Sequence, residues 1–425
     1  MSYARWATKE ELLSKLEKVE VNKKIDKSGI PLAYEENNLY IDNNVSHNLV
    51  IGSTGSGKTQ TTILPMINLA ISAKESIVVN DPLGELYEIN KEKLQKEGYE
   101  VAVLNFNKPD SGISWNPLDI PQKLYDNGDK DKASKMIEDI AYYIFTDTSR
   151  KEVDPFWVNS TINYFTGLTL YLFENSKENI NLLSLIDLKE QIEKEGSKKF
   201  IEKIDKNSVV YKNLSSILLA PPETRGSILS VFTVKIKNYI SREKINNMLS
   251  NSSFDIKSIN KKPTAFYIIS DKYSFGNSLI PLLINQIIDS ISLEKENNIR
   301  VNIFLDEFDF LVPIKDFSRL IEYTRRFNVR ITAVIKSYTH LYNMYTKEEV
   351  ELLKMCFGNI VYLLSNDIYT LEEISRQCGN KSSKKEPLIT PEELKTLDIY
   401  EAIILMPRMM PIRTKLLPNY EINWD

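Results

Sequence analysis

The strongest chemical signal in this sequence is a run of eight small and polar residues near its start. The run reads Gly52-Ser53-Thr54-Gly55-Ser56-Gly57-Lys58-Thr59 and matches the pattern G-x-x-x-x-G-K-S/T at every fixed position. Its glycines allow a tight turn in which backbone N–H groups point at phosphate oxygens. Lys58 is placed to reach the β- and γ-phosphates, and the Thr59 hydroxyl is placed to ligate Mg²⁺. The run therefore predicts a nucleoside triphosphate site.

Two predicted elements position this run. Apolar residues 49–51 ahead of it are typical of a short buried strand, and residues 61–73 after it carry apolar side chains at helical spacing. The phosphates would then lie at a helix N-terminus, where free N–H groups and the helix dipole favour anions. A glycine-rich turn that matched the pattern by chance would need neither neighbour, so this context favours the nucleotide site.

A pair of acids follows a second apolar run. Residues 301–305 are mostly apolar and lead directly into Asp306 and Glu307. In phosphate-loop enzymes an acid at this place serves the metal, so we expect Asp306 to hold Mg²⁺ through water. Glu307 would orient or deprotonate the attacking water. Because any strand end can carry acids, this pair indicates a metal site only together with the glycine-rich loop upstream. Asp81, which ends another apolar run, is either a ligand or a turn former before proline, and both readings stay open.

Apolar runs alternate with helical segments on both sides of a long middle region. This alternation predicts an α/β fold with a parallel sheet, whose strands include residues 76–81, 101–106, 264–271 and 301–307. Between residues 119 and 260 the strand-like runs vanish, and apolar residues recur every three or four positions. We therefore expect an N-terminal segment of residues 1–45, a nucleotide-binding domain of residues 46–118 and 261–425, and an inserted all-α domain of residues 119–260.

Composition excludes several classes of protein. With 42% hydrophobic and 26% charged residues among 425, the chain is typical of a globular protein of two or three domains. Its two cysteines and two histidines cannot build a disulfide framework or a zinc site. The net charge of −4 does not suggest a protein that binds nucleic acid over its whole surface. Any contact with DNA would need a local basic surface.

Several short strings occur in a fixed order along the chain. They are ARWAT (Ala4–Thr8), the phosphate loop, DPLGELYE (Asp81–Glu88), SWNPLD (Ser114–Asp119), DPFW (Asp154–Trp157), FLDEFDFL (Phe304–Leu311) and ITPEEL (Ile389–Leu394). In this combination the sequence resembles the coupling ATPases of conjugative type IV secretion systems, which hand a relaxase–DNA intermediate to the secretion channel. The resemblance covers nearly the whole chain.

This resemblance implies a fold, cofactors, partners and a location. The fold is a RecA-like phosphate-loop nucleotide-binding domain of the α/β class, interrupted by an all-α domain. The cofactors are ATP and Mg²⁺, and the active form is a hexameric ring with ATP at the subunit interfaces. The partners are the relaxase with accessory processing proteins, single-stranded DNA, and channel proteins at the inner or cell membrane. The location is the cytoplasmic face of the cell membrane.

The front of the chain departs from the family pattern. Members usually carry transmembrane helices ahead of ARWAT, whereas this chain begins almost at that point. We expect the chain as given to be soluble, either as a trimmed protein or as a naturally soluble member. Because hexamer contacts lose the effective concentration that an anchor supplies, we expect a monomer in dilute solution.

The resemblance also carries roles onto individual residues. Lys58 and Thr59 serve the phosphates and Mg²⁺, and Asp306 and Glu307 serve the metal and the water. Arg325 matches the arginine finger that one subunit supplies to its neighbour. Arg326 is one position away, so either arginine fits this role, and a surface arginine at a helix C-terminus is a further alternative.

Lys336 is the second departure from the family pattern. The family usually carries Gln-Ser at the end of the strand that follows the arginine, whereas this chain carries Lys336-Ser337. Glutamine can sense the γ-phosphate through its amide, but lysine brings a full charge and only donors. We expect Lys336 to engage the nucleotide differently, or to pair with Asp306 or Glu307 at rest and suppress hydrolysis.

Two other functions stay open at this point. One is a recruitment platform, in which ATP binding orders the ring, the helical domain docks the relaxase, and little translocation occurs. The acidic net charge favours this platform, because a DNA pump should line its pore with lysine or arginine. If the chain is a pump, the candidates for that pore lining are Lys235, Lys237, Arg242 and residues 381–385. The other is a DNA translocase of the chromosome-segregation type, against which the ARWAT and DPLGEL strings and the helical insertion argue.

Overall fold

The structure is a computed structural model, and it describes residues 3–21, 23–36, 38–146, 154–271, 275–293, 299–382 and 385–424. Its internal contacts divide the chain into two compact units. The first unit comprises Met1–Ala102, Ile256–Ile269 and Ile288–Asp425, and the second comprises Val103–Asp255 and Ser270–Ile287. No helix in the described ranges has both the length and the apolar character needed to span a bilayer.

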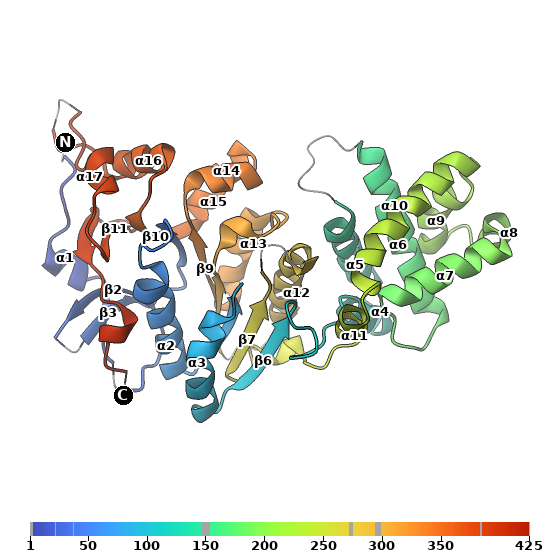
Figure 1. Cartoon of the computed structure of the whole chain (residues 1–425), viewed down its shortest axis with the longest axis horizontal. Coiled ribbons are helices and arrows are strands. Elements are labelled where there is room, and N and C mark those ends of the chain that lie inside the picture. The colour runs from blue at the N-terminus through green and yellow to red at the C-terminus, as the bar shows by residue number, and fades with distance from the viewer. Residues whose placement is uncertain are drawn as a thin grey trace. The chain divides into compact units, whose positions relative to one another are not determined.

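A large mixed sheet forms the centre of the first unit (Figure 1). Within the described residues its nine strands follow the order β12-β11-β10-β4-β9-β8-β5-β7-β6. The strands from β10 to β7 in this order run parallel, and β11 is antiparallel to both of its neighbours. Their bounds are β4 (His47–Gly52), β5 (Ser76–Asn80), β6 (Glu100–Asn105), β7 (Thr264–Ile269), β8 (Val301–Leu305), β9 (Val329–Ile335), β10 (Phe357–Leu364), β11 (Glu401–Leu405) and β12 (Ile412–Lys415).

The central strands read as continuous apolar runs because both of their faces are covered. Every residue of β4, β5, β7, β8 and β9 is buried, as expected for parallel strands with helices on both sides. Pairing fixes which strand ends meet: Ile51 pairs with Ile335, and Asn80 pairs with Leu305. The loops that follow β4, β5, β8 and β9 therefore leave the sheet at the same edge.

Helices of the first unit begin where the sequence supplies caps. Thr8 and Thr390 each form a capping box, with Glu11 and Glu393 respectively, as their position before an acidic helical turn predicts. The helices are α1 (Lys9–Leu13), α2 (Leu64–Ser72), α3 (Glu85–Lys96), α13 (Phe317–Thr324), α14 (Tyr338–Met344), α15 (Lys347–Cys356), α16 (Ile368–Cys378) and α17 (Pro391–Lys395). Helix α12 (Ile280–Leu293) crosses from the second unit into the first.

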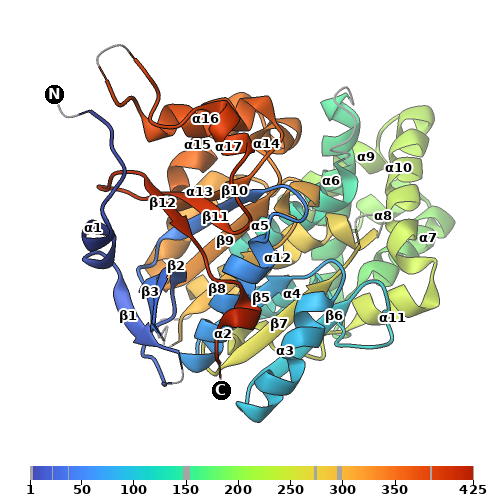
Figure 2. The same cartoon turned by 60° about the vertical axis from the view of Figure 1, so that its left-hand side comes forward.

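A small antiparallel sheet with the order β1-β3-β2 precedes the large one. Its strands are β1 (Glu17–Glu20), β2 (Ile30–Glu35) and β3 (Asn38–Asp42). Apolar residues of these strands share one cluster with Leu69 of α2 and Ile422 near the C-terminus. Figure 2 shows the red segment that ends at the C-terminus beside α2 in blue, and the Asn68 side chain of α2 donates a hydrogen bond to Asn419 Oδ1 at 3.0 Å. The C-terminal segment is thus fixed to the first unit.

Helices make up most of the second unit, and the described part of residues 119–260 contains no strand. Asp154 caps the most apolar of these helices by accepting a hydrogen bond from Phe156 N at 2.9 Å. The helices are α4 (Asp119–Asp126), α5 (Lys130–Phe145), α6 (Pro155–Asn175), α7 (Leu182–Glu195), α8 (Ser197–Ile201), α9 (Val209–Leu218), α10 (Pro222–Ile240) and α11 (Glu243–Ser250). The domain boundaries expected from the sequence stay a prediction.

Candidate functional site

The glycine-rich loop leaves the buried strand β4 and turns back on itself. Gly55 and Gly57 have φ angles of +81° and +92°, which side chains other than glycine rarely adopt. A side chain at Gly52 would collide with Ser56 Oγ as it now lies, so a larger residue here would have to displace that hydroxyl. Ser53 N donates to Leu364 O of β10 at 2.8 Å, which fixes the start of the loop to the neighbouring strand. The sequence pattern thus corresponds to a real constraint on the backbone.

A helical turn begins at Thr59, immediately after the loop. Thr59–Ile63 form a π-helical turn that continues into α2, so the helix starts two residues earlier than the apolar spacing predicts. Pro65 explains the wide turn, because it has no N–H to give to the carbonyl four residues before it. The first N–H groups of this helix are directed at the loop, where they favour an anion.

Lys58 lies among the loop's own carbonyl groups. Its Nζ donates to the main-chain oxygens of Gly52 and Ser53, the latter at 2.9 Å. Burial lowers the pKa of Lys58, and the nearby Asp306 and Asp309 carboxylates oppose this shift. An ammonium group that is half-desolvated and bound only to neutral oxygens gains most from a further anion.

Asp306 and Glu307 follow β8 at the same edge of the sheet. Burial raises the pKa of Asp306 to about 6, while a hydrogen bond from Glu307 N to Asp306 Oδ1 at 3.0 Å opposes the shift. Glu307 has a φ of +48° and a ψ of +42°, a left-handed conformation that costs a residue with a Cβ of the order of 1 kcal/mol. Such strain is concentrated at functional sites.

Lys336, at the end of β9, lies beside Glu307. Its Nζ is 3.9 Å from Glu307 Oε1 and 4.0 Å from the centre of the Phe310 ring. Of the two acids proposed as its partner, Glu307 is therefore the one within ion-pair distance. The Lys336 side chain is 27% exposed and that of Glu307 is 41% exposed, so solvent screens this pair.

Two residues that the sequence analysis did not select also lie here. Asp309 Oδ2 accepts from Lys336 N at 3.0 Å, and Asn80 Nδ2 donates to Asp306 O at 2.7 Å. The other carboxylate oxygen of Asp309, Oδ1, and the amide oxygen of Asn80, Oδ1, are buried and find no hydrogen-bond partner within the described part of the chain. The only sequence signal was indirect: Asp309 belongs to the FLDEFDFL string, and Asn80 ends an apolar run.

Asp81 lies at this edge but serves a helix, and the two arginines lie elsewhere. Asp81 Oδ2 accepts from Tyr87 N at 2.8 Å, so its carboxylate caps α3, which supports the turn reading of this residue. Arg325 and Arg326 form a 3₁₀ turn before β9, at the sheet edge opposite to the loop, and both are exposed. Arg325 donates to Cys356 O at 2.8 Å. Neither arginine belongs to the edge that carries the loop of its own chain.

The residues present fit a bound phosphate chain with a metal. Ser56 Oγ is buried in the loop without a hydrogen-bond partner among the described residues, as expected for a donor that awaits an anion. The described residues contain no cluster of three or more acidic, histidine or cysteine side chains that could hold a metal alone. Magnesium is usually held by one or two carboxylates together with substrate phosphates, which is the arrangement available here.

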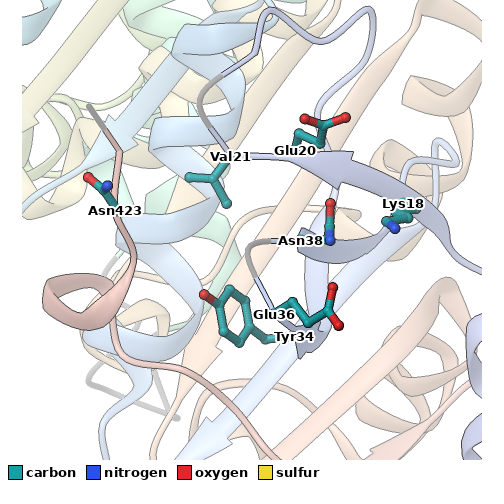
Figure 3. A pocket seen from close by; sticks show the side chains of 7 residues that line it. All are labelled: Lys18, Glu20, Val21, Tyr34, Glu36, Asn38 and Asn423. Atoms are coloured by element: carbon teal, nitrogen blue, oxygen red, sulfur yellow. The ribbon is translucent and has the colours of Figure 1, made fainter.

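A separate open hollow lies over the small N-terminal sheet (Figure 3). Charged side chains of both signs form its rim beside partly buried apolar groups; the lining is Lys18, Glu20, Val21, Tyr34, Glu36, Asn38 and Asn423. None of these residues belongs to the loop or to the strand ends that face it. This mixed lining does not point to one kind of ligand.

A glycine-rich loop between a buried parallel strand and a helix, with acids after a second strand, defines the phosphate-loop nucleotide-binding class of α/β proteins. The family model described as type IV secretory system conjugative DNA transfer matches residues 5–386. This chain belongs to that family. The resemblance seen in the sequence strings is thereby confirmed.

Solved structures agree with this fold. The plasmid coupling protein TrwB in complex with the non-hydrolysable ATP analogue ADPNP is 17% identical, with a TM-score of 0.68 over 98% of this chain and 94% of that chain. TrwB in complex with ADP and Mg²⁺ is also 17% identical, with a TM-score of 0.66 over the same shares. VirB4 of Thermoanaerobacter pseudethanolicus is 13% identical, with a TM-score of 0.59 over 94% of this chain and 99% of that chain. The predicted α/β fold class is confirmed. No curated protein matches the sequence.

Proposed function

We propose that this chain is an ATPase that couples hydrolysis to conjugative DNA transfer. It receives a relaxase–DNA substrate with accessory processing proteins and delivers it to the type IV secretion channel, as a hexameric ring at the cytoplasmic face of the cell membrane. The observation that carries this proposal is the strand register, which brings the glycine-rich loop, Asp306, Glu307 and Lys336 to one edge of the sheet. Family membership supplies the transfer context.

Each residue at this edge has a role in the proposed reaction. The N–H groups of the loop and Lys58 bind the β- and γ-phosphates of ATP, and Thr59 and Asp306 hold Mg²⁺. When bound, Mg²⁺ supplies positive charge that neutralises the phosphate oxygens. Glu307 orients the water and accepts its proton as the new oxygen–phosphorus bond forms and the bond to the leaving ADP breaks. Arg325 stabilises the γ-phosphate of a neighbouring subunit.

The helical segment has a separate role in this proposal. Residues 119–260 form an inserted all-α domain that recognises the protein part of the substrate, while residues 46–118 and 261–425 bind nucleotide. Lys235 is half-buried on α10, whereas Lys237 and Arg242 are exposed and available to single-stranded DNA. Of the basic loop at residues 381–385, Ser383 and Lys384 lie outside the described residues.

One contact favours a second candidate function, the recruitment platform. The Lys336–Glu307 pair holds the proposed general base against a cation, which suits a protein that binds ATP and hydrolyses it slowly. In that case ATP orders the ring and the chain gathers substrate without pumping DNA.

ATPase turnover across a range of protein concentrations separates these functions. A motor should show turnover that rises steeply with concentration and with single-stranded DNA, and that Lys58→Ala abolishes. DNA affinity should also fall steeply with salt, because a motor that tracks phosphates releases counterions on binding. Flat, negligible turnover with intact ATP binding would support the platform, and loss of ATP binding by the unmodified chain would contradict both.

A further inference from the structure

Tyr400 packs directly onto the glycine-rich loop. A Cβ added to Gly57 would lie 2.7 Å from both Cδ1 and Cε1 of the Tyr400 ring, so the ring rests against the bare Cα of this glycine. Tyr400 has a φ of +66°, an unfavourable left-handed conformation for a bulky residue. Its main-chain oxygen accepts from Leu416 N at 2.9 Å, and this contact holds the strained residue in place. The backbone that carries the ring is therefore held beside the loop.

Tyr420 extends this aromatic surface outward. Its hydroxyl lies 3.0 Å from the Tyr400 hydroxyl, and its side chain is 65% exposed. The 3₁₀ turn that carries it, Asn419–Glu421, is held from two sides, because Asn419 Oδ1 accepts from Asn68 Nδ2 of α2 and from Trp424 Nε1. The same turn contacts the first helical turn after the loop. The turn thus presents a large, mostly exposed aromatic side chain beside the loop.

The order of strands tells which end of a nucleotide would face these tyrosines. On one side of β4 lie β9 and β8, which carry Lys336, Asp306 and Glu307. On the other side lie β10 and β11, and Tyr400 immediately precedes β11. A triphosphate whose terminal phosphate points at the carboxylates must extend its nucleoside toward the opposite side of the loop. That side is where Tyr400 and Tyr420 lie.

We propose that Tyr400 and Tyr420 form an aromatic platform on which the base of the bound nucleotide stacks. This inference rests on the proposed nucleotide site and adds the subsite for the base. Every base presents a π face to an aromatic ring, so stacking contributes affinity with little selectivity between one base and another. The platform therefore predicts that ATP and GTP bind with similar affinity, and that both bind more tightly than a triphosphate without a base.

The simpler account is that the tyrosine pair only fastens the C-terminal segment to the loop. The two accounts differ in which ligands lose affinity. A stacking platform acts on ligands with a base alone, whereas a fastener acts through the shape of the loop and affects every phosphate ligand equally.

Binding of Mg²⁺-ATP and of inorganic tripolyphosphate to the full chain, measured by calorimetry, distinguishes them. We expect Tyr420→Ala to weaken ATP binding roughly tenfold, within the range for loss of one base-stacking ring, and to leave tripolyphosphate binding unchanged. Tyr400→Asn should do the same, because asparagine tolerates the left-handed backbone. Tyr420→Phe keeps the ring and should bind both ligands like the unmodified chain.

Tyr369→Ala is the matched control. Tyr369 is also exposed, and its hydroxyl lies 2.8 Å from that of Tyr342, but it lies on α16. Its replacement should change neither affinity. Equal losses for ATP and tripolyphosphate in Tyr420→Ala, or no loss for either, would overturn the platform while leaving the nucleotide site in place. An unmodified chain that binds neither ligand would overturn the nucleotide site and the platform together.

Discussion

At the scale of single residues, Lys336 is the clearest departure from the family pattern, because it places a cation where the family usually carries glutamine. Its ammonium group lies 3.9 Å from the carboxylate that we propose as general base. We expect Lys336→Gln to raise ATP turnover about two- to fivefold, because a partly exposed ion pair contributes up to about 1 kcal/mol. Steady-state phosphate release at saturating ATP measures this. Lys9→Gln, which breaks the exposed Lys9–Glu35 pair, is the control and should leave turnover unchanged. Unchanged turnover and nucleotide affinity in Lys336→Gln would count against a restraining role.

Asp306 gives a prediction about stability and pH. Burial raises its pKa from 3.8 to about 6, so the folded chain disfavours the charged form that prevails at neutral pH. The contribution that the protonated Asp306 carboxyl makes to the free energy of unfolding is fully present below pH 4 and is lost as the pH rises through 6. Asp306→Asn should therefore increase the free energy of unfolding at pH 7.5 by about 1–3 kcal/mol. Denaturant titrations without nucleotide at pH 7.5 and at pH 4 test this. The difference should vanish at pH 4, and a gain of equal size at both pH values would refute the explanation.

At the scale of elements, a buried ionic network joins the segment before β2 to the amino ends of the central strands. Ser28 donates to both carboxylate oxygens of Glu75, and its main-chain oxygen accepts from Arg300 at 3.0 Å and from Arg330 at 3.1 Å. Asn302 bridges Arg330 and Glu75. Burial lowers the pKa of Arg330 to about 10, since Glu75 offsets only part of the desolvation. Each charge in this network depends on the others.

Removing Glu75, the acid within ion-pair distance of both arginines, should therefore be costly. We expect Glu75→Gln to lower the free energy of unfolding by about 3–5 kcal/mol, because two buried guanidinium groups lose their counter-charge. Glu97→Gln is the matched surface change, since Glu97 pairs with Lys74 at 2.7 Å on an exposed face, and it should cost less than about 1 kcal/mol. Urea denaturation of the two variants compares them. Similar losses would mean that the network is not held together by Glu75.

Periodicity predicted most of these elements, and it failed where tertiary contacts replace local signal. The central strands and the helices of the second unit follow from apolar runs and from spacing. Strand β1 did not, because its sequence Glu-Lys-Val-Glu buries one side chain and exposes three charged ones. Pairing with β3, rather than any local preference, makes it a strand. The helix after the loop begins two residues before the apolar spacing predicts, because its first turn is π-helical.

The candidate site divides in the same way. Its loop and the pair of acids could be predicted, because consecutive residues carry that chemistry and the backbone must take one shape around it. Asn80 and Asp309 could not be selected, since only strand register brings them to the same edge. Tyr400 and Tyr420 reach the loop from the end of the chain, through contacts that no local pattern encodes.

At the scale of the whole molecule, the distribution of charges between the two edges of the sheet is the decisive feature. The proposed phosphate site lies where β4 and β8 end, and Arg325 lies before β9 begins, at the opposite edge. An arginine in this position cannot serve the loop of its own chain. If Arg325 acts as the proposed arginine finger, it must therefore reach the loop of a neighbouring subunit. Head-to-tail contacts of this kind form a ring when the rotation between subunits closes.

Mixing two inactive variants tests this arrangement directly. Lys58→Ala keeps its arginine and Arg325→Ala keeps its loop, so a mixed ring contains some interfaces with one intact partner from each. With random assembly about a quarter of the interfaces regain both groups, and ATP turnover of an equal mixture should approach that fraction of the unmodified chain.

Arg326→Ala in place of Arg325→Ala decides which of the adjacent arginines acts. Arg319→Ala, at an exposed arginine on α13, is the control and should be fully active alone. A mixture no more active than its separate components, in assembled rings whose subunits hydrolyse ATP independently, would contradict an arginine supplied between subunits.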